Sequence, residues 1–468
     1  MIQFILNERL IKTSAAPGMT ILDFIRYEKH LMGTKIGCRE GDCGACTILI
    51  GELIDDDIHY SSVTSCLMAI GNAHGKHIVT IEGLNMEGLN AVQQAFADEG
   101  ATQCGFCTPG FIVSLCSLSL RESQTYEDAI EVMNGNICRC TGYKSIERAG
   151  ERISKILAER NNEDRLSYAI KSRMIPEWFK DIKKSMQELN LEIDKDINAD
   201  KTAVVLGGGT DIYVQRHDTI EDQNINFIYN RKPSRVIIVE GDTCVIESAA
   251  TVTDLANSIA FKESFPNLKE HIKLVSSTQI RNMATLAGNF INASPIGDFT
   301  IFFLALNASV VLVEDENERT IALRDFYLGY KVLDKRAEEY ISKIKFKLPV
   351  DELFNFEKVS KRTHLDIASV NSAIHLKMDE QDIVSASVAA GGVGPIPKYL
   401  FNTSEFLTGK KLSASLIEDA IVIAQGEISP ISDARGSEQY KRLLLGQLIK
   451  AHFIKLFPNL PLQKLFHN

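Results

Sequence analysis

Short runs of alternating apolar and polar residues dominate the first eighty positions of the chain. Strand-like runs cover 2–6, 47–49 and 77–81, and the loops between them are rich in glycine. From about 84 to 160 the apolar residues recur at helical spacing instead. Pro109 begins a long apolar run, which is typical of proline in the first turn of a helix. The pattern therefore predicts a β-rich region followed by a helical one.

The remainder of the chain mixes strand-like and helix-like runs. Residues 151–200 are rich in charge and suit a connecting segment with some helix. A strand at 202–206 leads into a glycine-rich turn, and mixed patterning then continues to the end, with a break near Pro349. These boundaries divide the chain into successive segments, which are 1–82, 83–160, 161–200, 201–348 and 349–468.

Composition and charge narrow the class of protein. At 468 residues the chain is long enough for about three domains of roughly 150 residues each. The balance of 51 basic against 61 acidic residues gives a net charge of −10, which carries no sign of a nucleic-acid footprint. The start of the chain lacks the pattern of an export signal, and the longest apolar stretch, 300–313, is too short to span a bilayer. We therefore expect a cytoplasmic protein with reduced thiols, no membrane insertion and no nucleic-acid partner.

Eight of the ten cysteines fall into two sets of four. The first set is Cys38, Cys43, Cys46 and Cys66, and the second set is Cys104, Cys107, Cys138 and Cys140. The first set has the C-x4-C-x2-C spacing of plant-type [2Fe–2S] ligands, and the second combines a C-x2-C with a C-x-C. The sets predict two [2Fe–2S] clusters, with structural zinc as the alternative, above all for the second set. The remaining thiols, Cys116 and Cys244, lie in apolar runs and are expected to be inert core residues.

A glycine-rich turn at 207–211 follows the strand at 202–206. It lacks the G-x-G-x-x-G spacing of a Rossmann fold, but its backbone N–H groups can form a nest for a pyrophosphate. An ordinary strand-to-helix turn is the alternative. A second segment, 279–298, gathers small residues, amides and hydroxyls, as a buried dinucleotide contact requires. Asp298 ends this segment as a ribose or adenine acceptor or, alternatively, as a helix cap before 299–306.

Three cysteine motifs, at 37–46, 103–110 and 136–143, resemble those of the xanthine dehydrogenase and molybdenum hydroxylase family. Residues from about 165 onward look like the flavin domain of that family, and those from about 350 look like its companion C-terminal domain. The resemblance implies a multidomain α+β fold. Its parts are a β-grasp, ferredoxin-like [2Fe–2S] domain at 1–82, a four-helix [2Fe–2S] domain at 83–160, a linker and start of the flavin domain at 161–200, an α/β FAD-binding domain at 201–348, and a small C-terminal α/β domain at 349–468.

The resemblance also implies a set of FAD-binding residues. They are Leu206, Gly207, Gly208, Gly209, Thr210, Asp211, Ile212, Ala284, Thr285, Gly288, Asn289, Asn292, Ser294, Asp298 and Lys358. Without the family, Lys358 would be read as a solvated lysine on an exposed strand. The glycine turn departs from xanthine dehydrogenases at two positions. Those enzymes often have an asparagine and a glutamate there, where this chain has Gly209 and Asp211. Members of the family often carry an aromatic residue near the flavin ring, and the corresponding part of this chain has Val275 instead. These departures leave NAD as only one possible electron acceptor.

The chain lacks the large molybdopterin domain of the fused family members. The resemblance therefore implies a small subunit whose partner is a molybdopterin-binding large subunit, in a heterotetramer or dimer of heterodimers. Gln103 matches a family position that faces the pterin, which makes it a candidate for the interface. The molybdenum cofactor is expected on the partner only.

The implied function is electron transfer. Electrons from the partner's hydroxylation of a purine, related heterocycle or aldehyde would pass through two [2Fe–2S] clusters to FAD, and on to NAD or another acceptor. Arg39 and Arg139, each next to a cysteine ligand, are expected either to raise the cluster potentials or to be surface charges. No acid–base pair or nucleophile is predicted as catalytic. The alternatives are a stand-alone iron–sulfur flavin reductase and a non-catalytic iron–sulfur/FAD sensor.

Overall fold

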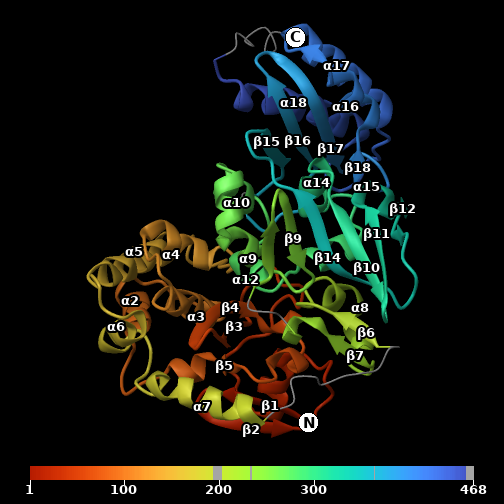
Figure 1. Ribbon diagram of the computed structural model, residues 1–468. Helices are drawn as coiled ribbons and strands as arrows, with labels where there is room; N and C mark the ends of the chain where they lie inside the picture. Colours follow the sequence, from red (N-terminus) through yellow and green to blue (C-terminus); the bar gives the residue numbers. More distant parts are fainter. Residues whose placement is uncertain (193–202, 232–234, 363, 460–468) are drawn as a thin grey trace. The chain divides into compact units, whose positions relative to one another are not determined.

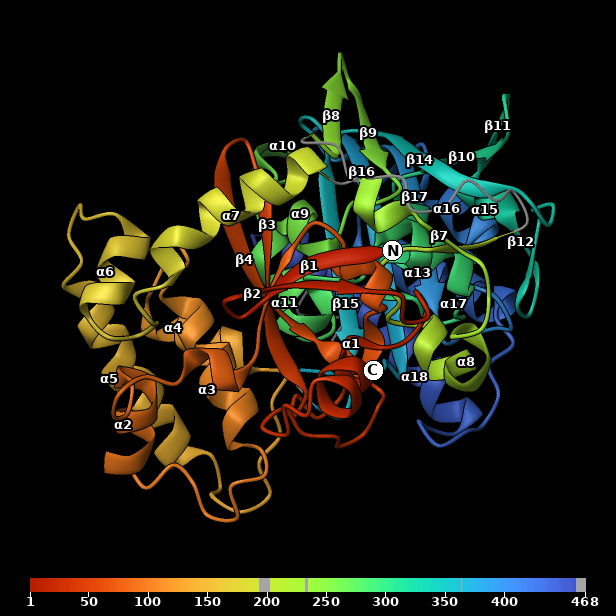
Figure 2. The same ribbon diagram turned by 90° about the horizontal axis from the view of Figure 1, so that it is seen from below.

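The computed structural model describes residues 1–192, 203–231, 235–362 and 364–459. They form two compact units, the first made of Met1–Ser234 with Ser276–Ala284, and the second of Arg235–Val275 with Thr285–Asn468 (Figures 1 and 2). Part of the predicted linker, 193–200, and Thr202 of the predicted strand lie outside the described residues. None of the described helices combines the length and the apolar character needed to cross a bilayer.

The first unit begins with a five-stranded mixed sheet in the order β2-β1-β5-β3-β4. Its strands are β1 Ile2–Leu6, β2 Arg9–Thr13, β3 Thr47–Ile54, β4 Asp57–Thr64 and β5 His77–Val79. The pair β1 and β5 is parallel, and the other pairs are antiparallel, as in a β-grasp fold. A short helix, α1 Ile21–Asp23, begins where the Thr20 hydroxyl accepts a hydrogen bond from the Asp23 N–H, and it continues into a π-helical turn, Phe24–Glu28. The three predicted strands are confirmed.

The helices that follow this sheet are α2 Ala91–Asp98, α3 Thr108–Leu118, α4 Tyr126–Met133, α5 Lys144–Ala158, α6 Arg165–Lys171 and α7 Phe179–Glu192. Helices α2 to α6 lie together in both views, whereas α7 packs against β1 and β3 of the sheet (Figures 1 and 2). Pro109 occupies the first turn of α3, as the sequence predicts, and capping boxes begin α2 and α4. Phe96, Phe111 and Leu115 are fully buried in the core between these helices.

The glycine-rich turn also belongs to the first unit. It joins β6 Val204–Leu206 to α8 Ile212–Ile220, and β6 pairs in parallel with β7 Ile225–Phe227. The chain contributes one further piece to this unit, the segment that carries α12 Thr278–Arg281. Tyr213, Ile280 and Met283 pack into the core under the β-grasp sheet, so the turn and α12 share the core of the first cluster domain.

The second unit contains two sheets. The first, in the order β11-β10-β14-β9-β8, is antiparallel and consists of β8 Ile237–Glu240, β9 Thr243–Glu247, β10 Ser309–Glu314, β11 Asn317–Ala322 and β14 Tyr340–Lys347. Short helices in the same unit are α9 Val252–Asn257, α10 Ile259–Ser264, α11 Leu268–Lys273, α13 Leu286–Asn292, α14 Asp298–Ala305 and α15 Leu323–Phe326. A small hairpin, β12 Tyr327–Gly329 and β13 Val332–Leu333, follows α15.

The second sheet has the order β15-β16-β17-β18, with β19 on β17. Its strands are β15 Leu353–Val359, β16 Val370–Asp379, β17 Asp382–Gly391, β18 Lys398–Tyr399 and β19 Lys410–Lys411. Three helices, α16 Phe401–Leu407, α17 Ala414–Glu427 and α18 Glu438–Leu456, share its apolar core. The architecture is therefore multidomain α+β, and this part of the prediction is confirmed.

Candidate functional site

The first cysteine set lies on the loop before β3 and on the turn after β4. Cys46 and Cys66 are buried, whereas Cys38 and Cys43 are partly exposed. A hydrogen bond with the Cys43 thiol lowers the pKa of Cys38 to about 5, and the same contact raises the pKa of Cys43. The thiols of Cys46 and Cys66 form a second hydrogen-bonded pair. The four ligands predicted from the sequence thus lie as two pairs of neighbouring thiols, Cys38 with Cys43 and Cys46 with Cys66.

The loop between the first ligands wraps closely around the sulfurs. Arg39, Gly41 and Gly44 all have positive φ, and the Glu40 N–H donates to the Cys38 sulfur at 3.3 Å. A Cβ at Gly37 would lie 2.5 Å from the Cys43 sulfur, which explains glycine there. Two thiol pairs with backbone N–H groups aimed at sulfur fit a [2Fe–2S] cluster, in which each iron takes two thiolates. Over the residues that the structure describes, no three His, Cys, Asp or Glu side chains are gathered around a single-ion site.

The second cysteine set lies at the start of α3 and on the loop between α4 and α5. The sulfurs of Cys104 and Cys140 are 3.6 Å apart, and Cys107 forms a hydrogen-bonded pair with Cys138. Thr141 supports Cys138, because its N–H and hydroxyl lie 3.4 and 3.1 Å from that sulfur. Cys104 and Cys140 are exposed, so the outer edge of this set faces the surface of the first unit. The pairing again fits a two-iron cluster.

The two cysteine loops contact each other directly. The Ile137 N–H donates to the Cys43 carbonyl at 3.0 Å, and the Asn136 side-chain amide donates to the Gly44 carbonyl at 3.0 Å. Gly110 on α3 permits this approach, because a Cβ there would collide with the Gly44 carbonyl oxygen. One backbone hydrogen bond therefore connects a ligand of the first set to the residue before Cys138.

The glycine-rich turn packs against the first cysteine set. Gly209 has φ +88°, and a Cβ there would collide with the carbonyl oxygen of Leu67, the residue after Cys66. A Cβ at Gly208 would collide with the Met283 carbonyl, and the Gly207 carbonyl accepts from the Asn72 amide at 2.9 Å. Glycine is needed here for close backbone contact. The predicted flavin turn and the predicted cluster therefore lie next to each other within the first unit.

Arg39 forms an ion pair with Asp23 beside the first cysteine set. Its guanidinium donates to both carboxylate oxygens of Asp23, at 2.6 and 2.8 Å, and lies 3.1 Å from the His217 ring on α8. Burial opposes ionisation of Asp23, but hydrogen bonds from Arg39 and Thr20 leave its pKa lowered. The carboxylate offsets most of the positive charge of Arg39. Arg139, by contrast, is exposed.

In the second unit, the predicted flavin residues begin with α13. The Thr285 hydroxyl caps this helix by accepting from the Gly288 N–H at 3.1 Å, and Asn289 accepts from the Thr300 hydroxyl at 3.1 Å. Asn292 is contacted by the Lys331 ammonium, 2.8 Å from its side-chain oxygen. The small polar residues of this segment thus bond to their own helix, to Thr300 of α14 and to Lys331.

Asp298 and Lys358 form a buried ion pair in the second unit. The Lys358 ammonium lies 2.7 Å from one Asp298 oxygen, and its side chain is only 1% exposed. Asn371 donates to the other Asp298 oxygen at 2.6 Å. Reading Lys358 as a solvated lysine is therefore wrong. The helix-cap alternative for Asp298 is also wrong, because α14 begins after Gly297 and shows no side-chain cap.

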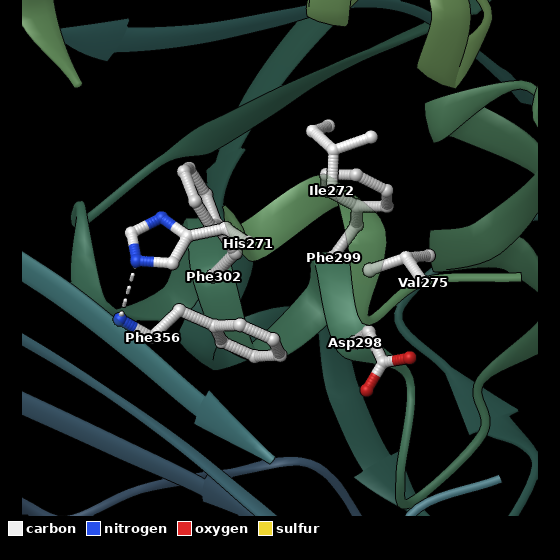
Figure 3. A pocket seen from close by; sticks show the side chains of 7 residues that line it. All are labelled: His271, Ile272, Val275, Asp298, Phe299, Phe302 and Phe356. Atoms are coloured by element: carbon white, nitrogen blue, oxygen red, sulfur yellow. Dashed lines mark hydrogen bonds between the residues drawn. The ribbon is translucent and has the colours of Figure 1, made fainter. Parts of the chain in front are cut away.

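A small aromatic cavity adjoins this ion pair (Figure 3). His271, Ile272, Val275, Asp298, Phe299, Phe302 and Phe356 line it. Figure 3 shows His271 and Asp298 at opposite ends, and the His271 ring accepts from the Phe356 N–H at 3.4 Å. Burial lowers the pKa of His271 to about 4, so the ring is neutral near pH 7. Phe299, Phe302 and Phe356 thus line the same cavity as Val275, although the sequence offered no aromatic residue at that position.

Sequence reasoning missed three residues that support the site: Asn72, Asn136 and Gln279. Each is buried and uses its side-chain amide to hold a segment that carries predicted ligands. Their only sequence signal is an amide inside or near a glycine-rich or cysteine motif. Cys116 and Cys244, expected to be inert, are fully buried, and burial raises the pKa of both thiols, that of Cys244 to about 12.

Four domain families match successive parts of the chain. They are a 2Fe-2S iron-sulfur cluster binding domain at 4–70, a [2Fe-2S] binding domain at 80–151, the FAD binding domain in molybdopterin dehydrogenase at 183–349, and the CO dehydrogenase flavoprotein C-terminal domain at 356–456. Along the chain, these four matches fall in turn on the β-grasp sheet, the helices α2 to α5, the sheet that contains β10 and the sheet that contains β16.

Curated relatives and solved structures agree with these matches. Xanthine dehydrogenase of Emericella nidulans is 28% identical over 88% of this chain and 35% of its own length, and xanthine dehydrogenase 1 of Arabidopsis thaliana is 27% identical over 89% and 37%. The chain thus spans about a third of the length of these relatives. Carbon monoxide dehydrogenase of Hydrogenophaga pseudoflava, in a form that lacks the Mo-pyranopterin moiety, matches with TM-score 0.51 and 25% identity over 55% of this chain and 90% of its own. Reconstituted CO dehydrogenase from Oligotropha carboxidovorans matches with the same score and identity over 55% and 91%. The chain therefore carries two [2Fe-2S] binding domains, an FAD-binding domain of the molybdopterin dehydrogenase type and a CO dehydrogenase flavoprotein C-terminal domain, and over most of its length it is similar to xanthine dehydrogenases.

Proposed function

We propose that this protein is the electron-transfer subunit of a molybdenum hydroxylase. It would receive electrons from a molybdopterin-binding partner and deliver them through two [2Fe–2S] clusters to FAD, and on to NAD or another acceptor. The supporting observation is that the Cys138 loop contacts the first cysteine set at Cys43, and the glycine turn packs against the same set at Leu67, next to Cys66. The relatives named xanthine dehydrogenase favour a purine or related heterocycle as substrate of the holoenzyme.

The chain's own residues position the redox groups. We assign the four cysteines of each set to one cluster. We assign to FAD the fifteen predicted residues Leu206, Gly207, Gly208, Gly209, Thr210, Asp211, Ile212, Ala284, Thr285, Gly288, Asn289, Asn292, Ser294, Asp298 and Lys358. The iron–sulfur groups supply one-electron transfer when bound, and the flavin supplies exchange between one- and two-electron transfer. The loops exclude water from Cys46 and Cys66 and fix the clusters through backbone hydrogen bonds. The domains of this proposal are 1–82, 83–160, 161–200, 201–348 and 349–468.

The second cysteine set offers a docking surface for the partner. Phe106, Ile137 and Tyr143 are 46%, 41% and 39% exposed beside the exposed Cys104 and Cys140. Apolar side chains of this size gathered around a redox site are typical of an interaction surface. We assign this surface, with the exposed Gln103, to the molybdopterin-binding large subunit, in an assembly of two heterodimers.

Co-purification from the native source tests the function. The expected result is a molybdenum-containing large subunit that reduces both clusters and the flavin when its heterocyclic substrate is added anaerobically. Full turnover with NADH and an artificial acceptor, without any partner, would instead establish a stand-alone flavin reductase. Absence of flavin reduction by any donor would favour a sensor.

A point variant tests the docking surface. Phe106→Glu should retain both clusters and the flavin but abolish co-purification of the partner, because a charge would be buried in the interface. Leu10→Glu is the matched control, since Leu10 is 49% exposed on β2, away from the cysteine sets in sequence. Equal recovery of the partner with both variants would refute this assignment of the surface.

A further inference from the structure

A buried network of side-chain amides joins three segments that carry predicted cofactor ligands. Asn136 lies two residues before Cys138, and its partner Gly44 lies between Cys43 and Cys46. Gln279 lies on α12, five residues before Ala284. All of these residues belong to the first unit. The network is therefore placed where both cluster loops meet the segment that leads to the flavin residues.

Asn136 is the centre of the network. Its amide nitrogen donates to the Gly44 carbonyl at 3.0 Å and lies 3.4 Å from the Thr47 hydroxyl. Its amide oxygen accepts from the Ser114 hydroxyl of α3 at 2.8 Å. The side chain is 5% exposed, so these bonds are made without competition from water. Asn136 thus binds the loop of the first cluster to the loop and helix of the second.

Gln279 attaches the flavin-side segment to the same point. Its amide nitrogen lies 3.1 Å from the Asn136 side-chain oxygen, 3.0 Å from the Ser114 hydroxyl and 2.8 Å from the Val132 carbonyl. Since Asn136 and Val132 present only acceptors there, the amide orientation of Gln279 is fixed. Gly135 leaves the necessary room, because a Cβ at that position would collide with the Gln279 side-chain oxygen.

The remainder of α12 is attached at both of its ends. The Thr278 N–H donates to the Asn134 side chain at 2.8 Å, and Arg281, 3% exposed, pairs with Glu131 at 3.0 Å. Beyond the helix, the Met283 carbonyl lies against Gly208 of the glycine turn. A displacement of Gln279 would therefore be transmitted to the turn that we assign to FAD.

We propose that Asn136 and Gln279 form an amide relay that sets the electron path, in which Asn136 positions the two clusters relative to each other and Gln279 positions the flavin turn relative to both. Neither residue is among the predicted cofactor ligands, and each acts through other protein groups, so both are positioning residues. The inference rests on the proposed electron-transfer function and assigns the residues that govern it. A small displacement would lengthen the distance between the redox groups and slow electron transfer between them.

The test compares three variants of the full holoenzyme. Asn136→Ala removes the link between the cluster loops, and Gln279→Met removes the amide of Gln279 while keeping the length of the side chain. Asn90→Ala is the control, because Asn90 is an equally buried amide that caps α2 and bonds to Leu84 and Gln93, away from the cysteine loops. Should Asn136→Ala fail to fold, Ser114→Ala removes one partner of the same amide and is well tolerated in a helix.

Two measurements separate positioning from general stability. The magnetic splitting between the two reduced clusters in electron paramagnetic resonance (EPR) spectra reports their distance and orientation. Pulse radiolysis delivers single electrons to the oxidised holoenzyme and reports the intramolecular equilibration that follows. Asn136→Ala should alter the splitting and slow cluster-to-cluster transfer about tenfold. Gln279→Met should leave the splitting intact but slow transfer to the flavin about tenfold, and Asn90→Ala should change neither quantity.

The outcomes distinguish this inference from the proposed function. If the wild-type protein contains no iron or flavin, the electron-transfer function itself fails. If the wild type contains both, and all variants show wild-type splitting and rates, the function stands and the relay is refuted. Slowing by all three variants alike, including Asn90→Ala, would also refute it, because the effect would then follow from stability alone.

Discussion

The Ile137 N–H donates a hydrogen bond to the Cys43 carbonyl at 3.0 Å, and this backbone bond joins the two cysteine loops beside the bond from the Asn136 amide to Gly44. Cys43 is a ligand of the first set, and Ile137 immediately precedes Cys138 of the second. The path between the predicted clusters therefore consists of covalent bonds and one short hydrogen bond. That arrangement supports the proposal that the two cysteine sets, distant in sequence, serve one path of electron transfer.

The Ile137 bond can be removed without changing the cysteine ligands. Ile137→Pro lacks the N–H, so the hydrogen bond to Cys43 is lost at a cost of about 1 kcal/mol. We expect both clusters to assemble and electron transfer between them to slow about tenfold. Ile137→Ala retains the N–H and is the matched control. Equal transfer rates in the two variants, measured by pulse radiolysis, would show that this bond is not part of the path.

The glycine turn should tolerate no side chain at position 208. In Gly208→Ala the new Cβ collides with the Met283 carbonyl, so the turn must move away from the segment that carries Met283. We expect a loss of bound FAD with about two irons retained at each cysteine set, measured by flavin absorbance and iron analysis. Gly426→Ala is the control, because nothing lies within 4 Å of its new Cβ. Full flavin content in Gly208→Ala would contradict the assignment of the turn.

The buried Lys358 should be essential for the second unit. Lys358→Met leaves the Asp298 carboxylate without its cation, and breaking a buried pair in this way costs about 3–5 kcal/mol. Flavin binding and thermal stability should both fall while the iron content is unchanged. The control Lys347→Met breaks the exposed pair with Asp242, which solvent screens and which therefore contributes little to stability. If both variants bind FAD equally well, Lys358 does not belong to the flavin site.

The second unit should lose stability in mild acid. Burial lowers the pKa of His452 to about 3 and that of His271 to about 4, against about 6.5 in the unfolded chain. Below pH 6.5 the unfolded state therefore binds more protons, and the free energy of unfolding falls by up to about 1.4 kcal/mol per pH unit for each histidine, until pH 4. His452→Gln should flatten this dependence in thermal unfolding between pH 6.5 and 4. The exposed His59→Gln should keep the wild-type slope, and an unchanged slope in His452→Gln would contradict the explanation.

Local patterns predicted the elements and ligands that depend on neighbouring residues. The spacing of Cys38, Cys43 and Cys46, the strand at Ile2–Leu6 and the helix that begins at Pro109 are set by a few consecutive positions. Long-range pairs escaped this reasoning. Lys358 meets Asp298 across 60 residues, and Gln279 meets Asn136 across 143 residues. Residue type alone therefore favoured a solvated lysine and a helix cap, because burial by distant strands leaves no local signal.

The iron and flavin content of the anaerobically purified chain, together with its EPR spectrum, tests the central claim most directly. Two binuclear clusters beside a flavin predict about four irons and one FAD per chain, with two distinct [2Fe–2S] signals in the EPR spectrum of the reduced protein. Cys66→Ser should remove one of these signals and leave the other. A colourless protein that contains zinc in place of iron, and no flavin, would contradict the account.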